Sequence, residues 1–131
     1  MRNTLHKSEI LRGYSVFSDI LKNGEFVQSS VLRCYFKKDR RENKRTVVRI
    51  GFAVARKDVA LAADRNRLKR LMREAYRKNK AGINTALEKR DLEVALVLIY
   101  RNTGGANVRR VRYATIESEL NDVFAKIISL V

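Results

Sequence analysis

The residues with the clearest chemical potential lie between positions 56 and 80, a segment with ten lysines and arginines and only three acids. Apolar residues recur there every three or four positions, which predicts a helix with one packing stripe. The stripe consists of Leu61, Leu68, Leu71, Met72, Ala75 and Tyr76. At about 100° per residue, the opposite face carries Asn66, Lys69, Arg70, Arg73 and Arg77, flanked by Arg65 and Arg67. The predicted helix thus combines a face that packs with a face of fixed cations.

This cationic face predicts a polyanionic partner. Like charges four positions apart, such as Lys69 and Arg73, repel each other by roughly 0.2–0.5 kcal/mol per pair. A solvated surface helix would instead interleave glutamate with lysine. Arginine suits phosphate oxygens, because its planar guanidinium can donate two parallel hydrogen bonds. Nucleic-acid phosphates are therefore the leading partner, and a merely solvated helix face is the alternative.

The composition supports a folded, nucleic-acid-binding protein. The 131 residues carry a formal charge of +15, and 45% of them are hydrophobic, which favours one folded domain over a basic disordered tail. A membrane surface is the alternative acidic partner. However, tryptophan is absent, no apolar run reaches the roughly 18 residues of a spanning helix, and the N-terminus lacks an apolar signal core. We therefore expect a cytoplasmic protein without membrane contact.

No set of residues forms a catalytic or metal-binding constellation. The chain has one cysteine, Cys34, and one histidine, His6, which excludes an intrachain disulfide and a cysteine-based zinc site. Asp58, Asp64 and Glu74 are spread along the basic segment and would not converge on a metal. We expect Cys34 to be a small core residue and the chain to act by binding alone.

The remaining elements are expected to position the basic segment. The residues predict an extended arm over 1–13, a helix over 14–23 closed by Gly24, one or two strands over 26–37, a charged loop over 38–46, a strand over 47–56, a helix beginning at Asp58 or Asp64, a polar and partly helical connection over 79–90, a buried strand over 92–100 and a helix over 113–129. The nearly continuous apolar run of 92–100 is typical of a central strand that is parallel to a neighbour. The general rule makes such a crossover right-handed.

One strand face could form a platform for single-stranded RNA. In the strand around residue 34, Leu32, Cys34 and Phe36 alternate with Val31, Arg33, Tyr35 and Lys37. The second set combines an aromatic ring with cations, as in surfaces where bases stack and phosphates are neutralised. An ordinary solvated face is equally compatible. For Phe17 in the first predicted helix, the residues alone favour core packing.

The basic helix resembles the signature helix of the bacterial ribonuclease P protein subunit. That signature is Arg-Asn-Arg, an apolar residue, Lys-Arg, two apolar residues and Arg, which residues 65–73 match. The order of elements is similar along almost the whole chain. The resemblance implies an α/β (α+β) two-layer sandwich of order α-β-β-β-α-β-α, with a mixed four-stranded sheet and a left-handed βαβ crossover.

The resemblance also implies a function. Such a protein binds a large catalytic RNA that removes the 5′ leader of precursor tRNA; the RNA requires Mg²⁺, for which no site on this chain is expected. The implied RNA contacts are Arg56, Lys57, Arg65, Asn66, Arg67, Lys69, Arg70, Arg73 and Arg77. The implied leader cleft contains Phe17, Leu21, Val31, Arg33 and Tyr35. The chain is expected to be monomeric without RNA and not to bind DNA.

Two positions depart from the family pattern. The segment before the signature usually ends in an apolar residue and glycine, whereas this chain has Asp58-Val59 and one extra residue before Arg65. The first helix of the family often carries a second aromatic residue, where this chain has Leu21. The rival hypothesis is a structural RNA-binding protein, such as a ribosomal protein, without a role in tRNA processing. A helix–turn–helix is disfavoured because no short helix precedes the basic one.

Overall fold

The structure is a computed structural model that describes residues 5, 9–40, 47–101 and 107–131. Its elements, in chain order, are α1 (Tyr14–Asn23), β1 (Glu25–Gln28), β2 (Leu32–Arg40), β3 (Val48–Val54), α2 (Ala62–Lys89), β4 (Leu92–Tyr100), the 3₁₀ helix η2 (Val108–Arg110) and α3 (Tyr113–Leu130). The predicted order of helices and strands is confirmed. His6, most of the predicted arm and most of the predicted 38–46 loop lie outside the described residues.

The four strands form one mixed sheet in the order β1-β2-β4-β3. Strand β2 is antiparallel to both β1 and β4, while β3 and β4 are parallel. Strand β4 therefore has a neighbour on each side, as its apolar sequence predicted. The register places Tyr35, Val97 and Gly51 in one row across the sheet and Arg33, Ile99 and Ala53 in the next. These two rows carry two of the predicted cleft residues, Tyr35 and Arg33.

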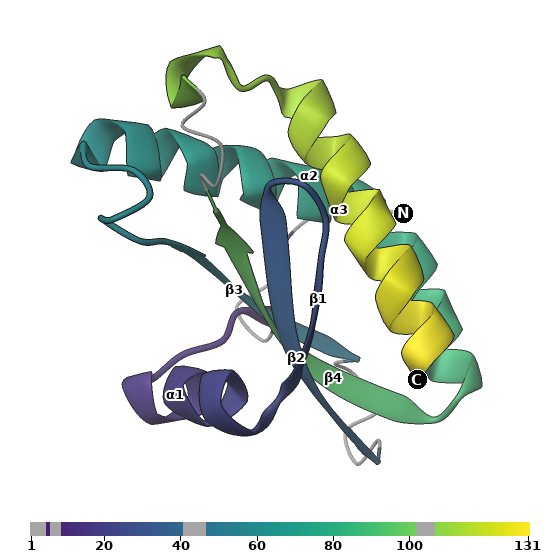
Figure 1. Cartoon of the computed structure of the whole chain (residues 1–131). Helices are drawn as coiled ribbons and strands as arrows, with labels where there is room; N and C mark the ends of the chain where they lie inside the picture. Colours follow the sequence, from purple (N-terminus) through teal and green to yellow (C-terminus); the bar gives the residue numbers. More distant parts are fainter. Residues whose placement is uncertain (1–4, 6–8, 41–46, 102–106) are drawn as a thin grey trace.

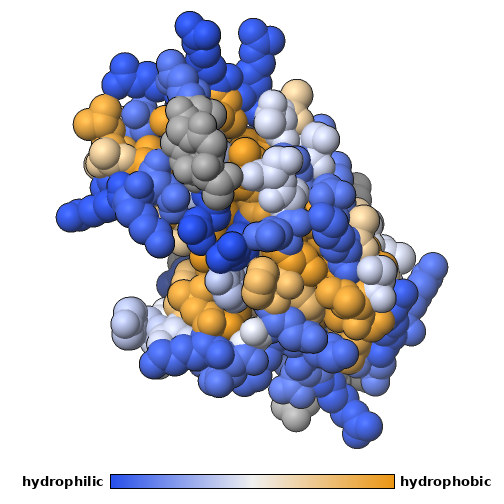
Figure 2. All heavy atoms as spheres, in the orientation of Figure 1, coloured by the Kyte–Doolittle hydropathy of each residue, from blue (hydrophilic) through white to orange (hydrophobic). Residues whose placement is uncertain are grey.

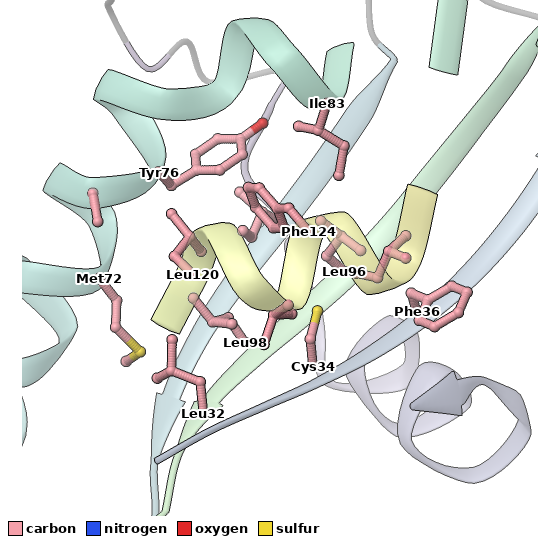
Figure 3. Close-up of a cluster of buried hydrophobic side chains, with 14 of the residues drawn as sticks. Leu32, Cys34, Phe36, Met72, Tyr76, Ile83, Leu96, Leu98, Leu120 and Phe124 are labelled. Atoms are coloured by element: carbon pink, nitrogen blue, oxygen red, sulfur yellow. The ribbon is translucent and has the colours of Figure 1, made fainter. Parts of the chain in front are cut away.

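Helices cover both faces of the sheet (Figure 1). Helices α2 and α3 pack together on one face, and α1 lies on the other. The main core lies between the sheet and the α2–α3 layer (Figure 3), where Cys34, Leu98, Tyr76 and Leu120 are fully buried. The predicted two-layer sandwich is thus confirmed, with α1 added on the opposite face. Cys34 has the core position that its alternation with Leu32 and Phe36 predicted.

Helix α2 is longer than the sequence pattern indicated. The prediction of a polar connection over 79–90 is wrong, because the helix continues to Lys89. Ile83 and Leu87 prolong its buried stripe, and this packing outweighs the roughly 1 kcal/mol that a helical glycine costs at Gly82. The helix ends where Asp91 adopts a positive φ of 55°. The sequence pattern failed here because polar residues outnumber the two buried ones.

The start of α2 also differs from the prediction. Neither Asp58 nor Asp64 caps it, since the N-cap is Leu61 and no side chain caps the first turn. Instead, the backbone N–H groups of Asp58 and Val59 donate to the carbonyl of Ala55 at 3.1 and 3.0 Å, which forms a separate turn. Val59 is buried, with 3% of its surface exposed. The turn and this anchored valine place the helix start after Asp58, and Asp64 lies in the first turn of the helix.

The N-terminal arm and the β1–β2 hairpin complete the fold. Ile10 forms a parallel bridge with Ile50 of β3, and the backbone N–H of Leu11 donates to Ile50 at 3.0 Å. Glu9 accepts a hydrogen bond from Lys80 of α2 at 2.9 Å. The predicted strand region 26–37 forms two paired strands, of which β2 reaches Arg40. The described part of the arm is therefore fixed to both the sheet and α2.

Candidate nucleic-acid interface

The first half of α2 presents cations on its outer face. Asn66, Arg70 and Arg73 are exposed and Lys69 is half-buried, while Leu68 and Met72 of the same turns are fully buried. Among the described residues, Lys69 and Arg70 make no ion pair or side-chain hydrogen bond. The Arg73 guanidinium lies 5.8 Å from the centroid of the Phe52 ring. In Figure 2, hydrophilic side chains project on several sides of the molecule, with hydrophobic patches between them.

Arg65 and Arg67 are used within the chain. The Arg65 guanidinium donates to the carbonyls of Val59 and Ala60 at 3.1 and 2.7 Å, closing the loop before α2. The Arg67 guanidinium donates to the carbonyls of Val108 and Val111 at 3.2 and 2.6 Å. The resemblance implied that both arginines contact RNA. In this structure, their Nη donors instead hold the backbone on either side of the cationic face.

Arg77 differs from the other predicted contacts because it has an acidic neighbour. Its Nη2 donates to Glu74 Oε1 at 2.5 Å, one turn away on the same helix. The hydrogen bond from Arg77 lowers the pKa of the Glu74 carboxyl and raises the pKa of the Arg77 guanidinium. The Arg77 end of the cationic face therefore carries an acid on the same helix. Among the described residues, the part of this face without an ion pair is formed by Asn66, Lys69, Arg70 and Arg73.

Two further basic segments flank the start of α2. Arg56 and Lys57 are exposed on the turn that precedes the helix, and Asp58 beside them pairs with Arg101 at 3.3 Å. On the other side, Arg109, Arg110 and Arg112 are exposed in and after η2. Arg109 lies 3.6 Å from Asp64 in the first turn of α2. This second basic cluster is thus connected to the signature helix.

On the α1 face, Phe17 and Tyr35 are brought together by a small hydrophobic cluster. Both are partly buried and pack against buried Leu11, Ile20 and Val97. The Phe17 ring lies directly over Gly51 of β3, where any side chain would overlap it. The missing side chain at Gly51 therefore makes room for α1 on this face of β3. Phe17 combines core packing with a position at the edge of the implied cleft.

The remaining cleft residues are divided between surface and core. Leu21 is 42% exposed on α1, and Arg33 lies on the Tyr35 face of β2, with its Nη1 3.4 Å from the Tyr35 hydroxyl. Val31 precedes β2 and packs against the larger core under α2 and α3. Its backbone N–H donates to Glu119 of α3 at 2.8 Å. It also lines a small pocket together with Arg33, so its place in the leader cleft stays a prediction.

The sequence reasoning missed one aromatic residue of this face, Phe26. It pairs with Tyr35 across the hairpin, their ring centroids are 5.5 Å apart, and 52% of its surface is exposed. The Arg33 guanidinium lies 5.1 Å from the Phe26 ring centroid. Strand alternation could have found it, because Val27 faces the core and its neighbour must face the other way.

A cavity of about 200 Å³ separates another part of α1 from the sheet. Val16, Asp19 and Ile20 line it from the helix, and Lys37 and Arg49 line it from the strands. None of the five implied cleft residues lines this cavity. Lys37 donates to Asp19 at 2.9 Å, and this hydrogen bond lowers the pKa of the Asp19 carboxyl. Two of the charged groups that line the cavity, Asp19 and Lys37, therefore pair within the chain.

The described residues offer neither a metal-ligand cluster nor a spanning helix. No three acidic, cysteine or histidine side chains among them are grouped as a metal ion would require. No helix in these parts of the chain is both long and apolar enough to cross a membrane. A mixed sheet that supports an unpaired cationic helix face and an aromatic–cationic strand face defines an α+β protein built to bind RNA.

Comparisons with known proteins agree with this class. The profile of the family described as Ribonuclease P matches residues 5–128. The ribonuclease P protein component of Chlorobaculum tepidum is 39% identical over 105 residues, which cover 76% of this chain and 68% of that protein. That of Chlorobium phaeobacteroides is 38% identical over 85 residues, covering 63% and 58%. This chain belongs to the ribonuclease P protein family.

Solved structures extend the agreement to the fold. The ribonuclease P protein of Thermotoga maritima is 30% identical and matches with a TM-score of 0.71, covering 90% of this chain and 96% of that one. The Staphylococcus aureus protein, at 21% identity, shares the fold with a TM-score of 0.68. The β3–α2–β4 crossover accordingly has the left-handed form that the resemblance implied, and the right-handed expectation from the general rule is wrong.

Family membership defines the role of the chain. It is a protein subunit of the endoribonuclease ribonuclease P, it takes part in tRNA processing, and its partner is the ribonuclease P RNA. This RNA partner accounts for a fold that exposes cations and an aromatic pair.

Proposed function

We propose that this subunit holds the catalytic RNA on the outer face of α2 and the 5′ leader of precursor tRNA on the α1 face of the sheet. The observation that carries the proposal is the unpaired cationic face formed by Asn66, Lys69, Arg70 and Arg73. Lysine and arginine there can neutralise RNA phosphates and release counterions. Arg56 and Lys57 extend this surface along the preceding turn.

The leader site rests on a different surface. Tyr35 packs in one cluster with Phe17 of α1, and the Arg33 guanidinium lies beside the Tyr35 hydroxyl. Leu21 is exposed on the same helix. A partly exposed ring and a guanidinium can bind an unpaired RNA strand through stacking and phosphate contact. The two surfaces would grip the substrate and the catalytic RNA at once, which raises substrate affinity without an acid or base from the protein.

We expect the chemistry and its cofactor to belong to the RNA. Mg²⁺ would be bound by the RNA and would supply the activated nucleophile and charge neutralisation there. The side chains of this chain would orient the leader and neutralise phosphates. A complex of this kind works where precursor tRNA is made, so we propose a cytoplasmic protein that is monomeric until it meets RNA.

The catalytic-RNA surface is tested by charge deletion. Arg70→Ala and Arg73→Ala should each weaken binding of the catalytic RNA and reduce the slope of log K against log salt by about one unit. Lys89→Ala is the matched control, because Lys89 is an exposed cation at the other end of α2. Unchanged slopes in both arginine variants would exclude the signature helix from the interface.

The leader surface is tested by the length of the substrate. Tyr35→Ala should weaken binding of precursor tRNA to the assembled holoenzyme, while binding of leaderless tRNA stays unchanged. Tyr35→Phe is the control, since it retains the ring and removes only the hydroxyl near Arg33. An equal loss for both substrates would refute the leader site and favour a structural RNA-binding role.

A further inference from the structure

Phe26 is a large apolar side chain that the core does not use. Half of its surface is in solvent, with 52% exposed, whereas the next residue, Val27, is buried against Cys34 in the strand register. A single exposed hydrophobic residue is ordinary on a protein surface. Phe26 differs because ordered neighbours hold its ring in a defined place while much of it stays accessible.

Those neighbours form a rigid platform. The antiparallel register sets Phe26 opposite Tyr35 and Gln28 opposite Arg33, on the same face of the β1–β2 hairpin. Arg33 donates to Gln28 Oε1 at 3.1 Å and to the Tyr35 hydroxyl at 3.4 Å. These contacts hold its guanidinium 5.1 Å from the Phe26 ring centroid, a cation–π arrangement. The platform therefore exists before any ligand arrives, which lowers the entropic cost of binding.

The hairpin that carries this platform is itself held in place by hydrogen bonds. The hairpin turn is fastened to α3, since Glu119 Oε1 accepts hydrogen bonds from the Ser29 hydroxyl and the Val31 backbone N–H at 2.9 and 2.8 Å. Lys126 of α3 donates to the carbonyl of Gln28 at 2.7 Å. Helix α3 thus holds the hairpin from the opposite face of the sheet. An edge strand so anchored can present a ring without shifting when a base stacks on it.

Apart from Tyr14 at the start of the helix, the α1 side of the same region supplies little aromatic surface. Leu21 is aliphatic and 42% exposed, and the Phe17 ring is largely occupied by its contact with Gly51. A base that leaves its neighbours in an unpaired strand needs a flat partner. Among the described residues on this face, Phe26 is the aromatic side chain with the most exposed surface after Tyr14 of α1, which is 88% exposed.

We propose that Phe26, backed by Arg33 and beside Tyr35, is a stacking site for one unpaired base of the precursor-tRNA leader. This inference rests on the proposed leader surface and adds to it a defined contact on β1. The exposed ring face takes the base, and the guanidinium beside it favours the adjoining phosphate. Stacking of this kind does not depend on base identity, because every base has a π face.

The test uses the holoenzyme assembled from this chain and its catalytic RNA. Phe26→Leu removes the ring and keeps an apolar side chain, and Phe26→Tyr keeps the ring. Loss of one stacked base should raise the Kd for precursor tRNA about tenfold in the leucine variant. The tyrosine variant should bind like the wild type, and neither variant should change the Kd for leaderless tRNA.

A leader series locates the stacked base. Each substrate carries one abasic nucleotide at a different leader position. At a single position, the missing base should lower the affinity of the wild type but should cause no further loss of affinity in the Phe26→Leu variant. An unchanged Kd for Phe26→Leu, or equal losses for leaderless tRNA, would overturn the stacking site. Urea unfolding of each variant shows whether the hairpin stays folded. If the leucine variant is destabilised, the Kd of the Phe26→Tyr variant is the deciding measurement.

The same experiment separates the two proposals. If Tyr35→Ala shows a leader-dependent loss and Phe26→Leu does not, the leader surface stands and the Phe26 site fails. If Tyr35→Ala shows no leader dependence either, the proposed leader surface itself fails. If Phe26→Leu weakens binding of the catalytic RNA alone, Phe26 contacts that RNA and the stacking site for the leader is refuted.

Discussion

Replacing Arg67 by alanine should destabilise this protein, even though Arg67 belongs to the basic signature of an RNA-binding helix. Its guanidinium donates to two backbone carbonyls, those of Val108 and Val111, at 3.2 and 2.6 Å. Hydrogen bonds from a charged donor contribute roughly 1.5–3 kcal/mol each, but the freed carbonyls of this turn can partly regain water. We expect the free energy of unfolding to fall by about 2 kcal/mol, which corresponds to about 7 °C in Tm for a chain of this size.

Arg70→Ala is the matched control for this prediction. Arg70 lies on the same helix, is exposed and makes no ion pair or side-chain hydrogen bond with the described residues. Its removal should change the free energy of unfolding by less than about 0.5 kcal/mol while weakening binding of the catalytic RNA. Urea unfolding followed by circular dichroism measures both variants. Equal stability of the two variants would show that Arg67 does not hold the η2 turn.

Three further outcomes follow from the packing. Burial raises the pKa of the Cys34 thiol, so a thiol reagent should modify Cys34 only after denaturation; rapid modification of the native protein would contradict its core position. Gly51→Ala should destabilise the protein by about 1–3 kcal/mol, because a Cβ there overlaps an α1 ring, whereas Gly82→Ala, in open space, should stabilise it by about 0.5–1 kcal/mol in thermal unfolding. Hydrogen bonds from Asn79 and from a tyrosine of α3 lower the pKa of Glu117. This stabilisation is present above pH 4.5 and is lost as pH falls through the lowered pKa. The difference in unfolding free energy between the wild type and Glu117→Gln should therefore shrink on acidification. A difference that is independent of pH would refute this prediction.

The sequence predicted the elements whose apolar residues are periodic. The stripe with Leu68 and Met72 gave α2, and the apolar run of 92–100 gave the central strand, because burial follows directly from these patterns. The pattern failed where a few buried residues outweigh many polar ones, as at Ile83 and Leu87. It failed again at the helix start, where the turn anchored by Val59 determines the position of the first residue.

The sequence also predicted part of the candidate RNA-binding site, because helical spacing determines which side chains are exposed. Arg70 and Arg73 lie on the exposed face that helical spacing required. The partners of Arg65 and Arg67 are loop carbonyls, which no spacing rule identifies. Strand alternation places Phe26 on the face opposite Val27, but only the register with Tyr35 and the contact with Arg33 show which residues surround its ring.

The central claim is that this chain serves a catalytic RNA in tRNA processing, and one cleavage assay tests it most directly. Precursor tRNA and the catalytic RNA of the same organism are incubated at low magnesium, with and without this protein. We expect accurate removal of the 5′ leader only when the protein is present, with reduced rescue by the Arg70→Ala variant. Tight RNA binding without any restored cleavage would contradict it.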